Sequence, residues 1–344
     1  MKHFLTIAAL LLALNSNAQS TSSAVEYMDY FSVEYLQIQK DMWDYTRSVS
    51  HGKSARKVEK RRAELISTTK AAMGKAKRAK AFKENANYRD SVIHYFELID
   101  IVLREDYAKI VDMEAIAEQS YDAMEAYMMA RDMASDKMKE AGEMINREHE
   151  AFAEANDVTI IEGEDSKLDG KMEIANLVYD HYNEIYLIFF KSYKQEMYLL
   201  DAIARKDINA IEQNRNALLS TVEEGMENLK EVKLYEGDQT MVGATRNLLK
   251  FYKKEAETDV DVILEYFEAK ENFEKIQKAF EAIKEKNRTQ EDVDTYNGAA
   301  SSVTDAANAY NSGNDASNKE RGMKIDNWNK TAERFTGKHV PRGK

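Results

Sequence analysis

The stretch "VEYMDYFSVEYLQIQKDMWDYTRSV", residues 25 to 49, contains neither proline nor glycine and has an apolar or small residue at every third or fourth position. Side chains with this spacing lie along one face of an α-helix. They are Val25, Met28, Phe31, Tyr35, Ile38, Met42, Thr46 and Val49. We therefore predict a helix that packs through this face.

Helix breakers are scarce in the rest of the chain, because its 344 residues include one proline, Pro341, and 13 glycines. Strand-like alternation occurs weakly, in "VTIIEG" at 158–163. The sequence predicts an all-α fold, a bundle of long helices, with "HGKS" at 51–54 and "YEGD" at 235–238 as breaks. The predicted helices cover about 23–50, 54–82, 87–118, 120–156, 168–205, 208–231, 239–285 and parts of 289–336.

The chain resembles itself when it is shifted by 153 residues, which aligns 62–82 with 215–235. Seven residues are then identical, namely Arg62, Leu65, Ser67, Thr68, Met73, Lys77 and Lys80 with Arg215, Leu218, Ser220, Thr221, Met226, Lys230 and Lys233. We interpret this as an internal duplication of two antiparallel helical halves. Helical sequences share periodicity by default, which is the alternative explanation.

The domain organisation that we predict follows from this repeat. It comprises a signal peptide at 1–18, a first helical half at 19–157, a linker at 158–167, a second helical half at 168–286 and a polar, weakly packed helical segment and tail at 287–344. The last segment is rich in Asn, Ser, Ala, Gly and Asp from Asn287 to Lys319.

The first residues, "MKHFLTIAALLLALNSNAQS", have the pattern of a secretory signal peptide that is cut after Ala18. The apolar run from Phe4 to Leu14 is shorter than the ~20 residues of a membrane-spanning helix. No cysteine occurs, which excludes disulfides, cysteine-based metal sites and a lipid-attachment cysteine. We expect a soluble protein exported to the periplasm, the cell surface or the medium.

Residues 54–83 form a basic segment with eleven Lys or Arg and two Glu, although the formal net charge of the chain is −12. The interpretation that we favour is charge balance with neighbouring acidic helices. The alternative is a docking face for an anionic partner, such as lipid headgroups, a polysaccharide or an acidic protein. Its candidate residues are Lys70, Lys75, Lys77, Arg78, Lys80 and Lys83. Nucleic acid is a poor candidate, because the segment has no aromatic residue before Phe82 to stack on bases.

Metal binding is the second hypothesis, because helical bundles can hold metals between facing helices. A histidine precedes a glutamate by three residues at His94/Glu97 and at His181/Glu184, which puts each pair on one helical face. We favour structural histidines at both places, because His181 continues an apolar stripe. Six methionines on one helix (Met124, Met128, Met129, Met133, Met138 and Met144) are likewise interpreted as core filling rather than a copper site.

Catalytic motifs are missing from the sequence: it has no glycine-rich phosphate loop, no G-x-S-x-G elbow and no H-E-x-x-H. We therefore predict no enzymatic activity and no cofactor.

Three stretches resemble a family of exported bacterial surface proteins of the leptospiral type. They are "AVEYMDYFSVEYLQIQKDM", "FKENANYRDSVIHYFELIDIVL" and "LYEGDQTMVGATRNLLKFYKKEAETDVDVI". The resemblance covers most of the mature chain and rests on a similar pattern of helix-forming residues and on the positions of the turns. It implies an exported surface protein without an assigned activity and brings no functional residues. Together with the signal peptide, it leads to the hypothesis of a protein that acts by binding or scaffolding, with metal or small-ligand binding as the alternative.

Overall fold

The structure is a computed structural model that describes residues 23–50, 55–161 and 164–342. These residues are almost entirely helical and form no β-strand, apart from one isolated bridge between Phe82 and Asn85. The predicted all-α class is therefore confirmed. The predicted signal peptide and the "HGKS" break lie outside the described residues.

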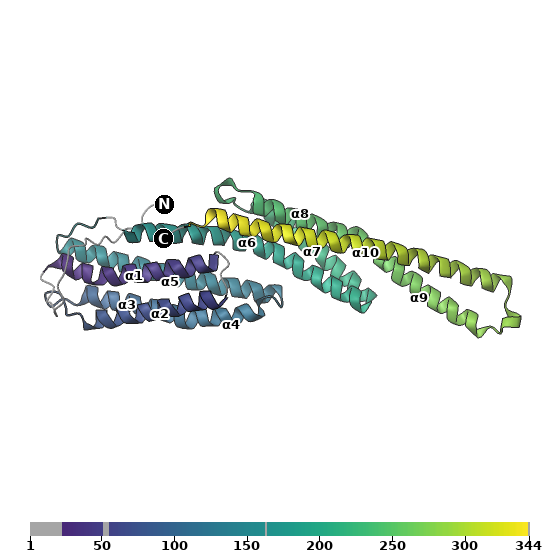
Figure 1. Cartoon of the computed structure of the whole chain (residues 1–344), viewed down its shortest axis with the longest axis horizontal. Helices are drawn as coiled ribbons and strands as arrows, with labels where there is room; N and C mark the ends of the chain where they lie inside the picture. The colour runs from purple at the N-terminus through teal and green to yellow at the C-terminus, as the bar shows by residue number, and fades with distance from the viewer. Residues whose placement is uncertain (1–22, 51–54, 162–163, 343–344) are drawn as a thin grey trace. The chain divides into compact units, whose positions relative to one another are not determined.

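The observed helix bounds differ from the predicted ones by about four residues at most (Figure 1). The α-helices are α1 (Ala24–Ser50), α2 (Ala55–Arg78), α3 (Asn87–Ile101), α4 (Tyr107–Ala117), α5 (Tyr121–Ala155), α6 (Glu164–Arg205), α7 (Ile208–Glu231), α8 (Thr240–Lys254), α9 (Val260–Ala282) and α10 (Gln290–His339). Two π-helical turns, η1 (Val102–Asp106) and η3 (Glu255–Asp259), join α3 to α4 and α8 to α9. Two short 3₁₀ turns are η2 (Tyr235–Gly237) and η4 (Glu285–Asn287).

Helix α2 ends at Arg78, four residues earlier than predicted. The Tyr27 hydroxyl donates to the carbonyl of Lys80 (2.9 Å), so a side chain from α1 satisfies a backbone acceptor beyond the helix end. Lys83 and Glu84 follow with φ of 46° and 69°, which no helix accommodates. Tertiary contact ends this helix, because its sequence has no local stop signal.

Contacts divide the chain into two units, which we describe separately. Unit 1 contains residues up to Asp180 and from Thr336 onward, and unit 2 contains His181–Phe335. Helices α6 and α10 contribute residues to both units. The division therefore falls within α6 and not in the stretch 158–167, where we expected a linker.

Unit 1 has a core rich in aromatic rings. The ring of Tyr88 stacks on that of Phe152 with 4.7 Å between centroids, and Tyr27 lies 5.2 Å from Phe82. The Tyr88 hydroxyl is 2.7 Å from Nδ1 of His149, which is also buried. The aromatic residues of the first predicted helix are therefore largely core residues.

Unit 2 is centred on Trp328, whose indole ring stacks on Phe189 at 4.2 Å between centroids. Its Nε1–H donates to the Thr245 hydroxyl at 2.8 Å. Trp328 and Phe335 are almost fully buried, although we expected residues 287–344 to be weakly packed. The difference arises because a few bulky residues spaced by a helical repeat anchor the end of α10, while the average composition of the segment remains polar.

The buried hydrogen bond of Trp328 leads to a stability prediction. Thr245→Val keeps the side-chain shape but leaves the indole N–H without an acceptor, so we expect a loss of about 1–3 kcal/mol of unfolding free energy. Thr245→Ser should retain the bond and lose less. The measurement is urea unfolding followed by Trp328 fluorescence in a Trp43→Phe background, because the chain has two tryptophans. Equal losses in both variants would contradict the prediction.

Three pairs of elements in the two units have bounds that correspond under the shift of 153 residues. The bounds of α2, 55–78, become 208–231, which are those of α7, and those of α3, 87–101, become the 240–254 of α8. The bounds of η1, 102–106, become 255–259, which are those of η3. The duplication itself stays a prediction, but the shift taken from the sequence pairs these elements end to end.

Unit 2 differs from unit 1 in the length of its last hairpin. Phe152 packs against Phe82, and Phe335 packs against Tyr235, the position that corresponds to Phe82. If Phe335 is taken as the counterpart of Phe152, the first residue of α5, Tyr121, corresponds to residue 304 of unit 2. Helix α10 begins at Gln290, so it starts fourteen residues earlier than this counterpart. Helix α9 likewise continues twelve residues beyond 270, the counterpart of Ala117.

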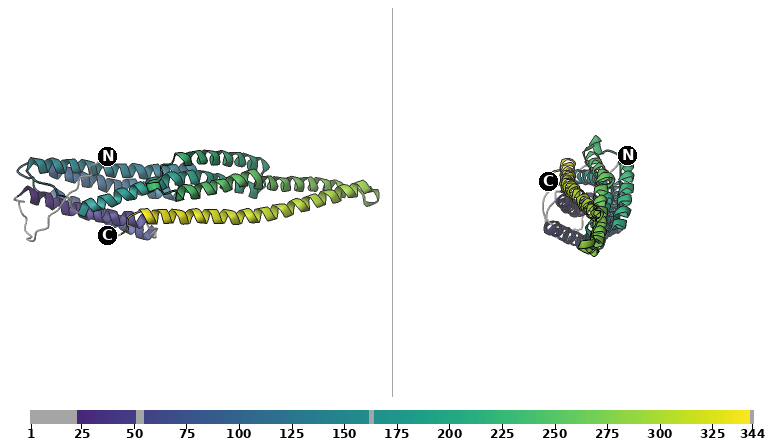
Figure 2. Two further views of the ribbon diagram at one scale, coloured as in Figure 1. Left: turned by 90° about the horizontal axis from the view of Figure 1, so that it is seen from above. Right: turned by 90° about the vertical axis from the view of Figure 1, so that its right-hand side faces the viewer.

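We call residues 271–303 the arm of unit 2. Figures 1 and 2 show its two helices side by side beyond the ends of α6 and α7. Phe280 stacks on Tyr296 across the pair, with 4.8 Å between ring centroids. Ala299 is the one buried residue of the arm, all of which the structure describes.

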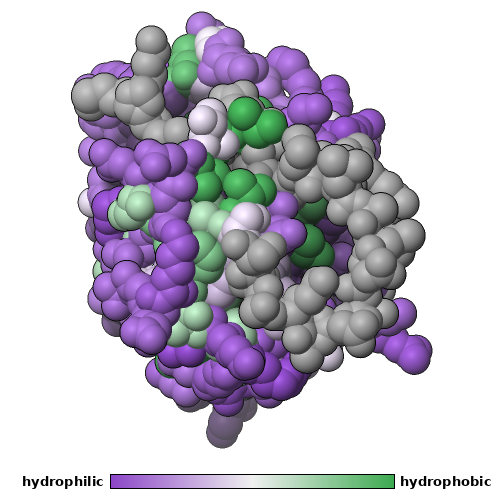
Figure 3. All heavy atoms as spheres, turned by 90° about the vertical axis from the view of Figure 1, so that its left-hand side faces the viewer, coloured by the Kyte–Doolittle hydropathy of each residue, from purple (hydrophilic) through white to green (hydrophobic). Residues whose placement is uncertain are grey.

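Hydrophilic side chains predominate among the described residues on the face drawn in Figure 3. Within the described part of the chain, no helix has the length and apolarity that crossing a membrane requires.

Candidate functional site

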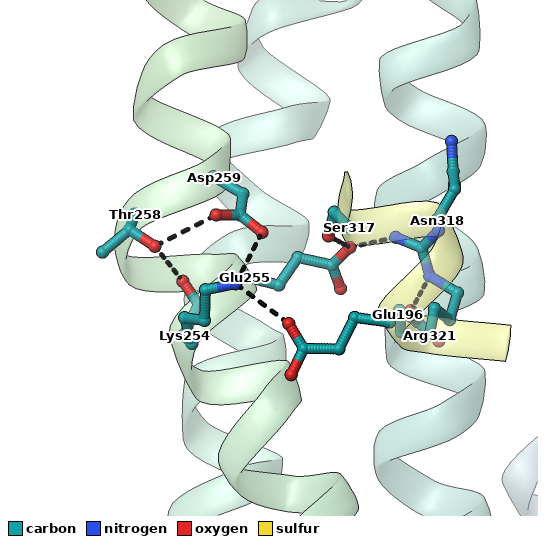
Figure 4. A network of polar contacts seen from close by, with 9 residues as sticks. Glu196, Lys254, Glu255, Thr258, Asp259, Ser317, Asn318 and Arg321 are labelled. Carbon is teal, nitrogen blue, oxygen red and sulfur yellow. Dashed lines mark hydrogen bonds and ion pairs between the residues drawn. The ribbon is translucent and has the colours of Figure 1, made fainter. Parts of the chain in front are cut away.

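A buried group of charged side chains joins three elements of unit 2 (Figure 4). Glu196 comes from α6, Glu255 from η3 and Arg321 from α10. The Arg321 guanidinium donates through Nε to Glu196 Oε1 and through Nη2 to Glu255 Oε1. We call these three residues the carboxylate–arginine cluster.

The cluster is nearly inaccessible to water. The side chains of Glu196, Glu255 and Arg321 are 0%, 5% and 13% exposed. Taking a charge out of water costs several kcal/mol, and contact with an opposite charge repays this only in part. A buried cluster with two carboxyl groups and one guanidinium therefore lowers the stability of the fold.

Local sequence explains how each carboxyl group comes to be buried. Glu196 follows Ile185, Phe189 and Ser192 on the apolar stripe of α6, so the helix carries it inward. Glu255 is the first residue of the π-helical turn and is preceded by buried Tyr252. A π-turn adds a residue to the helical repeat and thereby changes which side chains face the core.

Weaker polar contacts surround the cluster at its rim. The Ser317 hydroxyl lies 3.5 Å from Glu255 Oε1, and Asn318 Oδ1 accepts from Arg321 Nη1. Lys254 pairs with Glu320 at 3.1 Å and lies 4.0 Å from Asp259. The rim ion pairs are half-exposed, so they contribute little to stability compared with the buried centre.

The protonation of the two carboxyl groups is coupled. Burial, together with the nearby Glu255 carboxylate, raises the pKa of Glu196 to about 8, and burial also raises the pKa of Glu255. Burial beside Glu196 raises the pKa of Tyr252 well above its ordinary value. The site therefore favours a state in which the two glutamates do not both carry a charge.

The histidines that the sequence offered as metal ligands lie in different units. His94, in unit 1, is exposed, and its neighbour Glu97 pairs with Lys77 at 2.8 Å. His181, in unit 2, is buried against the rings of Phe335 and Tyr235, whereas Glu184 is exposed. Among the described residues, no three His, Cys, Asp or Glu side chains gather in a way that could hold a metal ion. The metal site stays a prediction without geometric support.

The candidate docking residues on and after α2 fall into three groups. Lys75 pairs with Glu34 on α1, and Lys77 pairs with Glu97 on α3, as charge balance predicts. Lys83 lies over the ring of Phe82, 5.0 Å from its centroid. The others, Lys70, Arg78 and Lys80, are exposed and form no ion pair with a described residue.

Comparison of the chain with protein-family models, with curated proteins and with solved structures finds no match. No similar protein therefore indicates a role for the carboxylate–arginine cluster. Sequence reasoning missed all three residues, because a glutamate on a charged helix is normally solvated. One local signal was present: Glu196 interrupts an apolar stripe that continues with Leu199.

Proposed function

We propose that the protein is exported and acts by binding or scaffolding, without catalysis, and that it consists of two copies of one helical unit. Contact with a partner is made by the arm, residues 271–303. The signal-peptide pattern supports export, and the matching helix bounds of the two units support the duplication.

The arm is the observation that carries this proposal. A two-helix hairpin buries little apolar surface by itself, so its ordering must be offset elsewhere. The arm adds length beyond the hairpin of unit 1 while burying one residue, Ala299. An extension of this kind contributes little to the stability of unit 2 but presents both of its helices to another molecule.

Shortening the arm tests the proposal. Residues 271–303 are replaced by Glu-Gln-Ser, the residues that join α4 to α5 at 118–120. We expect unit 2 to stay folded, as judged by circular dichroism and Trp328 fluorescence.

Crosslinking tests the contact with a partner. A photo-crosslinking residue is placed at Lys278 in the full-length arm, and we expect discrete crosslinked products to form in the producing cells.

The matched control carries the same photo-crosslinking residue at exposed Glu223 on α7. If Lys278 gives no more discrete product than Glu223, the arm is not the binding element. Loss of folding in the shortened protein would instead show that the arm is part of the structure of unit 2.

The anionic docking face predicted on and after α2 has its own test. Changing Lys70, Arg78 and Lys80 to Glu should lower the salt concentration that elutes the protein from heparin, with little change in stability, because these side chains pair with no acidic group in the described part of the chain. The paired residues Lys75 and Lys77 serve as the control. Their reversal should cost about 0.2–1 kcal/mol of unfolding free energy for each broken pair. Equal elution of both variants and the wild type would argue for charge balance alone.

A further inference from the structure

The carboxylate–arginine cluster has one more acidic group than basic groups, and the two carboxyl groups lie side by side, because one guanidinium, that of Arg321, donates to an oxygen of each. Among the described residues, no N–H or hydroxyl group lies at hydrogen-bonding distance from Glu196 Oε2 or Glu255 Oε2, both of which are buried, and the Tyr252 hydroxyl, which is buried beside Glu196, also has no partner at that distance. A proton on one carboxyl group supplies the missing donor. We propose that Glu196 holds one proton at neutral pH and donates it to Glu255, and that unit 2 loosens around η3 when this proton is lost.

Because the cluster is buried, a proton is the simplest way to neutralise its excess negative charge. The one cation in the cluster, Arg321, is already shared between the two carboxyl groups. A second ionised carboxylate would therefore be a net buried charge, which proteins avoid by taking up a proton. The raised pKa of Glu196, about 8, agrees with this geometry.

Unit 1 indicates that the fold does not need charges at two of these places. Under the shift of 153 residues that pairs η1 with η3, Glu255 corresponds to Val102, which is buried and apolar. Under the pairing of Phe152 with Phe335, Arg321 corresponds to Met138, which packs in the same apolar cluster as Val102. Unit 2 thus has two charged groups, Glu255 and Arg321, where unit 1 has apolar side chains, which points to a role other than holding helices together.

The position of Glu255 explains where the loss of the proton would act. Glu255 begins η3 and Asp259 ends it, so this turn already departs from regular α-helical hydrogen bonding. Ionisation of Glu196 would place two negative charges beside this turn. We expect repulsion and water entry to weaken the packing of η3 against α6 and α10.

Other charged or titratable groups near the cluster could also respond to pH, so a test must separate them from Glu196. They are Tyr193 on α6, Tyr252 and Lys254 on α8, Asp259 on η3, Glu320 and Lys324 on α10, and Arg215 on α7, which pairs with Asp261.

Infrared difference spectroscopy of the wild-type protein between pH 6 and pH 9 tests the proton directly. The band of a protonated carboxylic acid should be present at pH 6 and lost with a midpoint near pH 8. Glu196→Gln should lack this band, whereas the control Glu265→Gln, at an exposed position on α9, should keep it. A wild-type protein without a titrating carboxylic-acid band in this range would overturn the proposal.

Stability gives a second and independent measurement. The raised pKa of Glu196 means that its stabilising contribution is complete below the unfolded value of 4.5 and is lost as pH rises through about 8. The unfolding equilibrium constant of unit 2 should therefore rise about 100-fold or more across this range, followed by Trp328 fluorescence. Glu196→Gln, which resembles the protonated acid, should remove most of that rise, and Glu265→Gln should not. A Glu196→Gln protein that follows the wild-type profile would contradict the proposal.

Discussion

Replacing Arg321 with methionine is expected to destabilise unit 2 by about 3–5 kcal/mol, because it leaves two buried carboxyl groups without a cation. Arg321 contacts both Glu196 and Glu255 and is itself mostly buried. Proton uptake by the second carboxyl group would reduce the loss at low pH. The measurement is urea unfolding at pH 7.5, followed by Trp328 fluorescence in the Trp43→Phe background.

Removing all three charges together should have the opposite outcome. The triple variant Glu196→Leu, Glu255→Val and Arg321→Met has three apolar side chains, and those at 255 and 321 are the residues that unit 1 has at the corresponding positions, Val102 and Met138. Replacing a complete buried ion cluster by apolar residues is often neutral or stabilising by about 1–4 kcal/mol. We expect the triple variant to be at least as stable as the wild type, although it contains Arg321→Met, which alone is expected to be strongly destabilising.

Lys330→Met is the matched control on the same helix, because Lys330 pairs with Asp326 at the surface. We expect a change of about 0.5 kcal/mol or less. If the triple variant were as unstable as Arg321→Met, the charges would be needed to specify the packing of α10. In that case the cluster would be structural, and apolar side chains like those of unit 1 could not replace it.

Most of the fold could be predicted from the sequence, because helix formation depends on patterns within short stretches of sequence. The apolar spacing from Val25 to Val49 and the near absence of proline and glycine predict α1 and the other long helices. The turn at "YEGD" is also local, since Asp238 accepts from the backbone N–H of Thr240 at 2.9 Å. The π-turns have no such local pattern, because each depends on how a helix packs against its neighbours.

The carboxylate–arginine cluster could not be predicted in the same way. Glu196 and Arg321 are 125 positions apart, and nothing in either local sequence indicates the other. Their contact depends on the register of α6, η3 and α10, which only the tertiary structure defines. The basic segment was partly predictable, because charge balance predicts that its lysines pair with acidic neighbours, as Lys77 does with Glu97, but does not choose which lysines form such pairs.

Unit 1 should respond to pH in the opposite direction from unit 2. Burial lowers the pKa of His149 to about 4, whereas the unfolded chain takes up a proton near 6.5. A depressed pKa means that the stabilising contribution is complete above pH 6.5 and is lost as pH falls through about 4. The full difference is about 3 kcal/mol of unfolding free energy. The measurement is urea unfolding between pH 7 and pH 4, followed by Trp43 fluorescence in a Trp328→Phe background.

His149→Gln keeps a polar partner for the Tyr88 hydroxyl but does not titrate, so the stability of unit 1 should become nearly independent of pH in this window. His94→Gln is the control, because His94 is an exposed histidine of the same unit and should leave the slope unchanged. A slope that persists in His149→Gln would assign the acid sensitivity to carboxyl groups instead. Since each unit contains one tryptophan, the same protein scanned from pH 4 to pH 9 should lose the packing around Trp43 at the acid end and the packing around Trp328 at the alkaline end. Three paired elements of the two units have corresponding bounds, so we assign such opposite behaviour to the titrating side chains that differ, His149 in unit 1 and Glu196 in unit 2.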